Sequence, residues 1–130
     1  MNKFFKFNEF VEIGKIFRDC EAYLIALEYF NKAIALRYLP INKECLVEAY
    51  ELRGITKRFL GRYLESIIDY SKAIDLDPKN SYLYFGRGMS YEYLNQNEEA
   101  LKNLKMSLAI TPDFSLALSM VDYLENEKNS

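Results

Sequence analysis

The sequence predicts an all-α fold: a right-handed α-solenoid of three helix–turn–helix repeats with a seventh, capping helix. Two observations predict it. Key residues recur at a fixed distance, since Gly88 lies thirty-four residues after Gly54 and Pro112 thirty-four after Pro78. Apolar residues also recur every three or four positions, as they do on one face of a helix. A constant period of this length indicates an array of helical repeats. The chain has 130 residues, half of them hydrophobic, which suffices for one folded domain.

The first predicted repeat covers residues 7–40 and is the least regular. Its first helix should be followed by a turn at residues 21–23. The small residues of the second helix allow the two helices to approach closely. The apolar stripes of the two helices consist of Phe10, Ile13, Gly14 and Phe17, and of Ala26, Phe30 and Ala33.

Residues 41–46 are an insert between the first two repeats. The segment contains no glycine or proline and consists mainly of good helix formers. We therefore expect it to lengthen the front of the third helix by about one turn. Asn42 is predicted to be the N-cap of that helix.

Residues 47–80 and 81–114 form the second and third predicted repeats. The turns within them should fall at Gly61 and at residues 95–97, where Asn95 tolerates the left-handed conformation that glycine takes. Ser81 is predicted to cap the helix that it opens. The residues that match between the two repeats are Tyr50 and Tyr84, Gly54 and Gly88, Ser66 and Ala100, and Pro78 and Pro112.

Residues 113–127 are predicted to form the seventh helix. The end of a solenoid must cover its last apolar face, and this helix is suited to do so. Residues 127–130 are expected to fray. The apolar face of the helix is predicted to consist of Phe114, Leu118, Val121 and Leu124. The whole chain, residues 1–130, is thus predicted to be one domain.

These units resemble the tetratricopeptide repeat, a helix–turn–helix of thirty-four residues. The family pattern places a bulky aromatic residue four positions before a glycine, a small residue twelve positions after it, and a proline at the end. The second and third units match this pattern throughout. The first matches at Phe10, Gly14 and Ala26, but its proline, Pro40, comes two residues late. The resemblance covers residues 7–127 and implies a protein that binds other proteins.

Two arginines depart from the family pattern. Arg53 and Arg87 stand where leucine is usual, and Lys57 stands where a large aromatic residue is common. Because Asp69 lies on the second helix of the repeat that contains Arg53, we predict an ion pair between them. Arg87 is predicted to face Asn103 in the same way. The corresponding positions of the first repeat hold Ile13 and Tyr29.

The charge and the residue types disfavour several classes of function. The formal net charge is −2 and no histidine is present. Without histidine, Ser-His-Asp and Cys-His catalysis and the usual zinc sites are not expected.

Cys20 and Cys45 do not form a CxxC pair, and both are predicted to be buried or half-buried thiols in a reducing compartment. The basic cluster Arg53, Lys57, Arg58 and Arg62 is read as helix-surface cations, so no nucleic-acid partner is predicted.

The sequence also lacks signals for cofactors and membranes. Gly86 and Gly88 form a GxG without the third glycine of a dinucleotide-binding loop. We therefore predict no cofactor, no metal and no enzyme activity. No apolar run approaches the roughly 20 residues that span a bilayer. Residues 1–7 look briefly like a signal peptide but no cleavage site follows. A cytoplasmic protein without membrane insertion is expected.

A binding site is predicted in the concave groove, which the first helices of the repeats should line. The groove turns apolar and aromatic toward the C-terminal half, and such patches usually mark interaction sites. Its predicted apolar residues are Leu52, Ile55, Phe59, Tyr82, Phe85, Met89, Tyr93 and Tyr123, and its predicted rim charges are Glu48, Glu51, Arg58 and Glu92. The alternative is that Ile55, Phe59, Met89 and Tyr93 only pack between repeats.

The predicted function is that of a protein–protein interaction module, an adaptor whose groove takes an apolar helix or extended peptide. One alternative is a homodimeric scaffold in which the groove binds a second copy. Another is a chaperone for secreted or membrane-inserted clients. Tetratricopeptide domains that hold the acidic tails of heat-shock chaperones use a clamp of Lys, Asn and Arg. The matching positions here hold Val11, Lys15, Leu52, Tyr82 and Gly86, which disfavours that ligand.

Overall fold

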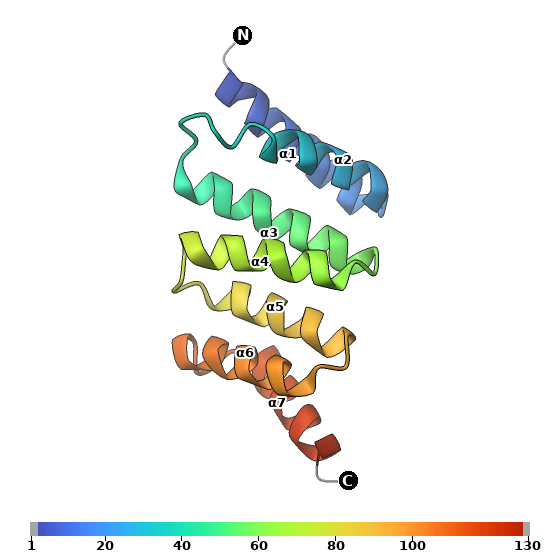
Figure 1. The fold of residues 1–130 in the computed structure, drawn as a ribbon, viewed down its shortest axis with the longest axis vertical. Helices are drawn as coiled ribbons and strands as arrows, with labels where there is room; N and C mark the ends of the chain where they lie inside the picture. The colour runs from blue at the N-terminus through green and yellow to red at the C-terminus, as the bar shows by residue number, and fades with distance from the viewer. Residues whose placement is uncertain (1–2, 129–130) are drawn as a thin grey trace.

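The structure, a computed structural model, describes residues 3–128. Helices occupy most of this range, and it contains no strand. The helices are α1 (Lys3–Asp19), α2 (Tyr23–Ile34), α3 (Lys43–Phe59), α4 (Tyr63–Leu76), α5 (Ser81–Tyr93), α6 (Asn97–Ile110) and α7 (Ser115–Lys128). Figure 1 shows them stacked along the long axis of the molecule, with the two ends of the chain far apart. The predicted all-α repeat fold is confirmed.

The helices pack as three hairpins and a final helix. The pairs α1–α2, α3–α4 and α5–α6 have the most extensive contacts, and each hairpin packs on the next through α2–α3, α4–α5 and α6–α7. Helix α3 also contacts α1 and α5 directly. The first helices of the hairpins therefore lie next to one another. In Figure 1 the turns within the hairpins lie together along the right edge. The division into repeats at residues 7–40, 47–80 and 81–114 stays a prediction.

The turns within the hairpins share one left-handed residue at equivalent positions. Gly61 has a φ of 77° and Asn95 a φ of 59°, which confirms the predicted similarity of these turns. Glu21 takes the same conformation in the first hairpin, with a φ of 60°. A side chain with a β-carbon is disfavoured there, so the sequence alone gave no reason to expect it.

The insert before α3 behaves as predicted. Helix α3 has 17 residues against 13 in α5, a difference of about one turn. The Asn42 side chain accepts a hydrogen bond from the Cys45 backbone N–H at 3.0 Å, which confirms the predicted N-cap. The predicted Ser81 cap is wrong, because Asn80 caps α5 by accepting from the Tyr82 N–H. Ser81 is already inside the helix, and its hydroxyl accepts a hydrogen bond from Thr111.

Apolar residues gather in two clusters. The larger one runs through α1 to α5, and the smaller one joins α5, α6 and α7. In the smaller cluster Leu124 is buried, and Phe114 and Val121 pack against it. The predicted burial of Leu118 is wrong: its side chain is exposed, since α7 packs mainly against α6 and Leu118 lies away from that contact. The predicted fraying of residues 127–130 falls partly outside the described residues, although Glu127 belongs to α7.

Candidate functional site

A surface on α3 and α5 carries most of the predicted binding residues. Residues three and four positions apart lie on one face of a helix, so each helix contributes one stripe to this surface. Since α3 and α5 are in contact, the two stripes lie side by side. We call this surface the inner face and define it by Glu48, Glu51 and Ile55 on α3 and Tyr82, Phe85 and Met89 on α5.

The inner face is aromatic on α5. Tyr82 is 64% exposed, and its ring lies 5.1 Å from that of Phe114, centroid to centroid. The Phe85 ring lies 4.8 Å from the same Phe114 ring and is half-buried. Met89 is half-buried one turn further along the helix. Phe114 thus contacts both rings of the inner face. The sequence predicted only that Phe114 belongs to the apolar face of the last helix.

The inner face is acidic on α3. Glu48 is exposed and forms an ion pair with the Lys15 ammonium at 3.1 Å. The same ammonium also pairs with Glu12 at 3.0 Å. Glu51 is half-buried, and among residues 3–128 no cation pairs with it. Burial raises the pKa of the Glu51 carboxyl, and the neighbouring charge of Glu48 raises it further. Ile55 is half-buried and packs against the larger apolar cluster.

Between these two parts, the Tyr70 ring passes from α4 toward the inner face. A β-carbon built on Gly86 would lie 2.5 Å from the Tyr70 hydroxyl oxygen, so only glycine fits beside the ring. Arg58 donates to that hydroxyl at 3.1 Å and to the Gly86 carbonyl oxygen at 3.4 Å. Burial raises the pKa of Tyr70 to about 12. Arg58, predicted as a rim charge, is therefore held by two partners between α3 and α5.

Leu52 does not belong to the inner face. Its side chain is 6% exposed and lies in the larger apolar cluster, so the prediction that it lines the groove is wrong. It occupies the same repeat position as Gly86, which is packed on Tyr70 of the preceding hairpin. This position faces the neighbouring hairpin. A period of thirty-four identifies the equivalent positions but does not show what each one meets.

Phe59 and Tyr93 lie at the turn end of their helices. Phe59 stacks on Tyr23 with ring centroids 4.9 Å apart, and Tyr93 stacks on Tyr63 at 5.0 Å. Both remain more than half exposed. Each contact joins the end of one first helix to the start of the preceding second helix. These rings border the inner face and lie on the edge where the turns gather.

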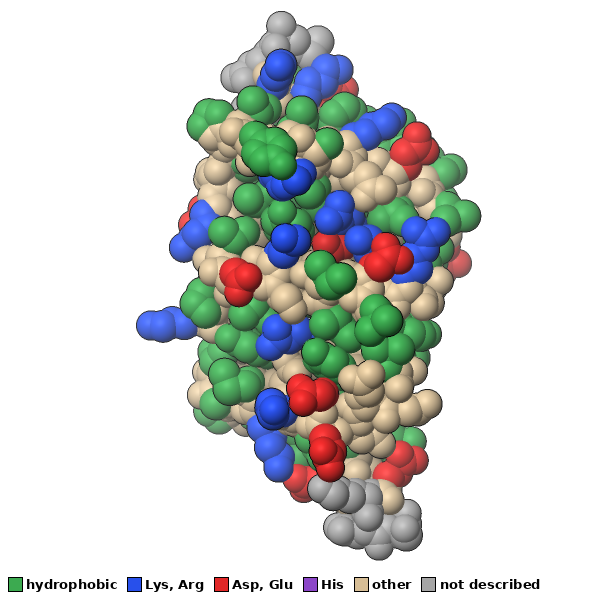
Figure 2. Space-filling view, viewed as in Figure 1, with side chains coloured by type: hydrophobic (Ala, Val, Ile, Leu, Met, Phe, Trp, Pro, Cys, Tyr) green, Lys and Arg blue, Asp and Glu red, His purple; other side chains and the backbone are tan. Residues whose placement is uncertain are grey.

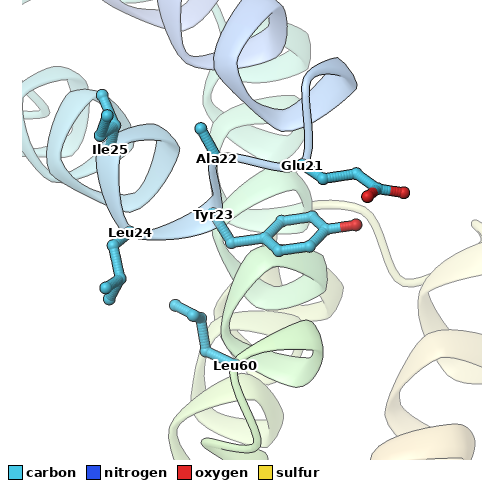
Figure 3. Close-up of a pocket in the computed structure, with 6 residues that line it drawn as sticks. All are labelled: Glu21, Ala22, Tyr23, Leu24, Ile25 and Leu60. Carbon is cyan, nitrogen blue, oxygen red and sulfur yellow. The ribbon is translucent and has the colours of Figure 1, made fainter.

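The same edge exposes apolar residues that sequence analysis missed. Figure 3 shows a pocket there, in which Leu60, just after α3, points toward Tyr23 and Leu24 at the start of α2, and Ile25 also lines the pocket. In Figure 2 apolar side chains gather on the right half of the visible face, at the level of α4 and α5. The exposed apolar residues of α2 and α4 are Leu24, Ile25, Leu64 and Ile68. They lie between the positions of the helical core stripe, so the periodicity gave no signal for them.

The predicted Arg53–Asp69 pair is confirmed. Arg53 donates from Nε at 3.0 Å and from Nη2 at 2.8 Å to the two oxygens of Asp69, which is fully buried. Lys57 adds a second cation at 3.0 Å from Asp69. Arg87 donates to Asn103 at 2.7 Å, as predicted for the third repeat. Of the basic cluster, Arg53 and Lys57 pair with Asp69, and Arg58 donates to Tyr70. These three cations therefore stabilise the fold.

Comparison with known proteins agrees with this architecture. Two family models, both described as tetratricopeptide repeat, match residues 47–80 and 70–102. The structure superposes on the tetratricopeptide domain of Arabidopsis OM64 with a TM-score of 0.87 and 21% identity, covering 97% of this chain and 99% of that one. This chain is a tetratricopeptide repeat protein. The resemblance inferred from the residue spacing is thereby confirmed.

Other relatives of this tetratricopeptide repeat protein are larger or carry peptides. Mouse sperm-associated antigen 1 is 32% identical over 83 residues, which are 63% of this chain but 9% of that protein. The Dictyostelium STIP1 homologue is 38% identical over 53 residues, 41% of this chain and 9% of that protein. The first tetratricopeptide domain of Spaghetti (RPAP3), bound to the HSP90 peptide SRMEEVD, has a TM-score of 0.84 at 20% identity and covers 96% of this chain and 94% of that one.

The remaining predicted residues of the tetratricopeptide repeat protein are peripheral. Tyr123 is exposed on α7, at the position equivalent to Met89, and donates to Glu127 at 2.9 Å.

The prediction that both cysteines are buried or half-buried is wrong for Cys20, which is exposed beside the first turn, whereas Cys45 is half-buried. Among the described residues, no three Cys, Asp or Glu side chains are grouped to hold a metal ion. Within the same range, every helix is too short or too polar to cross a bilayer.

Proposed function

We propose that this tetratricopeptide repeat protein is an adaptor that binds an apolar segment of another protein on its inner face. Protein–protein interaction is the function that the family supports. The observation that carries the finer proposal is the exposed aromatic surface of α5, where Tyr82 and Phe85 share the Phe114 support and Met89 extends the patch. Aromatic residues and methionine are enriched in the buried centres of protein interfaces.

The local chemistry disfavours an acidic tail of the kind in SRMEEVD as the ligand. Val11 and Leu52, at two of the clamp positions, are buried, and Gly86 provides no side chain. Lys15 is already paired with Glu12 and Glu48. A carboxylate placed on the inner face would therefore meet the charges of Glu48 and Glu51, while Lys15 and Arg58 are already engaged with other partners, which costs free energy. An apolar segment avoids this cost.

The proposal can be tested by selecting peptides from a random dodecapeptide phage library on the immobilised protein. We expect the unaltered protein to enrich peptides with apolar or aromatic residues. The double variant Tyr82→Ser/Met89→Ser should enrich none, because it removes the apolar side chains at the two ends of the α5 stripe. Circular dichroism should show unchanged helix content, since Tyr82 is mostly exposed.

A matched control removes an apolar side chain elsewhere. Ile68→Ser changes a residue of α4 that is 56% exposed and lies outside the inner face. This variant should enrich the same peptides as the unaltered protein. If Ile68→Ser abolishes enrichment and Tyr82→Ser/Met89→Ser does not, the binding surface is the edge near the turns and the proposal fails.

A further inference from the structure

Glu51 is an unusual residue for the middle of a binding surface. It is half-buried on α3, and among the described residues no lysine or arginine pairs with it. The cations of this surface are engaged with other groups: Lys15 pairs with Glu12 and Glu48, and Arg58 donates to Tyr70 and to the Gly86 carbonyl. A carboxylate that has lost part of its water without gaining a cation is poorly compensated.

The surroundings of Glu51 are net negative. Glu12, Glu48 and Glu51 bring three carboxylates to this part of the molecule, against the two cations Lys15 and Arg58. The charge of Glu51 also reaches the Tyr70 hydroxyl, where it opposes ionisation. Glu51 is therefore within electrostatic reach of the Tyr70 hydroxyl, which lies against Gly86 of α5. An approaching cation would be attracted to the carboxylates of Glu48 and Glu51, and an anion would be repelled from them.

The neighbouring helix offers apolar contacts at the matching positions. Phe85 occupies on α5 the place that Glu51 occupies on α3, and Tyr82 stands in the place of Glu48. Packed helices lie about 8–10 Å apart. A strand-like segment advances about 3.3 Å per residue. A segment that crosses from α3 to α5 thus spans the two places with about three residues.

We propose that the inner face binds an extended segment of a partner protein in which a lysine or arginine, seated on Glu51 beside Glu48, lies about three residues from an apolar or aromatic side chain that packs on Phe85 and Tyr82. This inference rests on the proposed function and adds the charge and spacing of the ligand. The cation restores to Glu51 the partner that the chain does not supply. The apolar side chain covers the exposed rings of α5.

The test uses the same random dodecapeptide library at about 50 mM salt, where charge attraction is weakly screened. The unaltered protein should enrich peptides with Lys or Arg about three positions from an apolar residue. Glu51→Gln should still enrich apolar peptides but without a preference for Lys or Arg. The Gln side chain keeps the size of Glu51, and removing a half-buried charge should not harm folding.

A second step measures the coupling directly with one selected peptide. Replacing its lysine by norleucine should weaken binding to the unaltered protein about tenfold. The same replacement should weaken binding to Glu51→Gln much less, because only the charge of Glu48 remains there. An equal loss of affinity in both proteins would show that the peptide lysine does not bind at Glu51. A selection that yields acidic peptides, or apolar peptides without cations, also overturns the inference.

The two failures can be told apart. If the unaltered protein enriches no peptide above background, the proposed function fails and this inference fails with it. If apolar peptides are enriched and Tyr82→Ser/Met89→Ser loses them, while Glu51→Gln behaves like the unaltered protein, only the cation seat is wrong. A protein that enriches nothing and elutes as a dimer uses a second copy as its ligand, which also overturns the inference.

Discussion

Tyr70 is the residue on which the junction between the second and third hairpins depends. Its ring lies against Gly54 of its own hairpin and Gly86 of the next, and its hydroxyl accepts a hydrogen bond from Arg58. The equivalent residue of the first hairpin is Phe30, whose counterpart to Gly86 is Leu52. The larger ring, Tyr70, is thus matched by glycine on the next hairpin, and the smaller ring, Phe30, by leucine.

Gly86→Ala should strongly destabilise the protein. The added β-carbon would collide with the Tyr70 ring, which is fixed on both sides. We expect the free energy of unfolding to fall by about 2 kcal/mol, as in other overpacked cores. Urea unfolding followed by circular dichroism measures this change.

A second substitution tests the cause. Tyr70→Leu replaces the ring by the smaller side chain that the third hairpin has at the equivalent position, Leu104. Gly86→Ala/Tyr70→Leu should then be more stable than the sum of the two single changes predicts. Strict additivity would show that the collision with Tyr70 is not the source of the loss.

Glu51 makes stability depend on pH in the direction opposite to that of most acidic residues. Burial and the charge of Glu48 raise its pKa in the folded state above its ordinary value. The folded protein therefore binds the proton more tightly than the unfolded chain does. Stability falls as pH rises from the unfolded pKa through the folded pKa, and the penalty is fully present above the folded pKa.

Glu51→Gln should therefore raise the melting temperature at pH 7 and leave it unchanged at pH 3, where the carboxyl is protonated in both states. Thermal unfolding at the two pH values provides the measurement. Glu28→Gln, a change at an exposed glutamate of α2, serves as the control and should show no such difference. A gain of equal size at both pH values would contradict the role of the charge.

At the scale of the element, three equivalent positions show two ways of joining the helices of a hairpin. The second hairpin uses Arg53, Lys57 and Asp69, which are joined by hydrogen bonds and ion pairs of 2.8–3.0 Å. The first hairpin uses only apolar and aromatic residues at these positions, with the Phe17 and Tyr29 rings stacked at 5.7 Å. The third hairpin has a mixed set, in which Arg87 donates to Asn103 at 2.7 Å and Tyr91 replaces the lysine. The fold thus tolerates either solution.

Asp69→Ala should cost about 3 kcal/mol of unfolding free energy, because it leaves two partly buried cations without their acceptor. The triple variant Arg53→Ile/Lys57→Phe/Asp69→Tyr copies the first hairpin. We expect its stability to lie within about 1 kcal/mol of that of the unaltered protein, since apolar residues often replace a buried ion pair without loss. Urea unfolding of both variants decides the matter. A triple variant as unstable as Asp69→Ala would mean that the two solutions are specific to their hairpins.

For the whole molecule, the decisive property is whether the inner face is free. The proposed function requires a monomer of about 15.3 kDa in solution. Light scattering on a sizing column, at two protein concentrations about tenfold apart, should give this mass at both. A dimer that Phe85→Ser dissociates would favour the homodimeric scaffold, because the aromatic surface would already be covered.

The sequence by itself determined the repeat architecture and the features that follow from local geometry. The thirty-four-residue period, the left-handed turns at Gly61 and Asn95, the Asn42 cap and the Arg53–Asp69 pair all depend on residues close in the chain or at equivalent positions within one hairpin. Residue spacing captures such relations, because helix geometry fixes which side chains are neighbours.

Only the tertiary structure decided which residues remain exposed between hairpins. Leu52 is buried, while its neighbour in the chain, Glu51, stays partly accessible and pairs with no cation of the described residues. The Phe59 ring stacks on Tyr23 at the edge where the turns lie. These outcomes depend on the size of the side chain that the adjacent hairpin presents and on how far one hairpin is rotated against the next. A periodic pattern contains neither quantity, so the composition of the inner face could be predicted only in part.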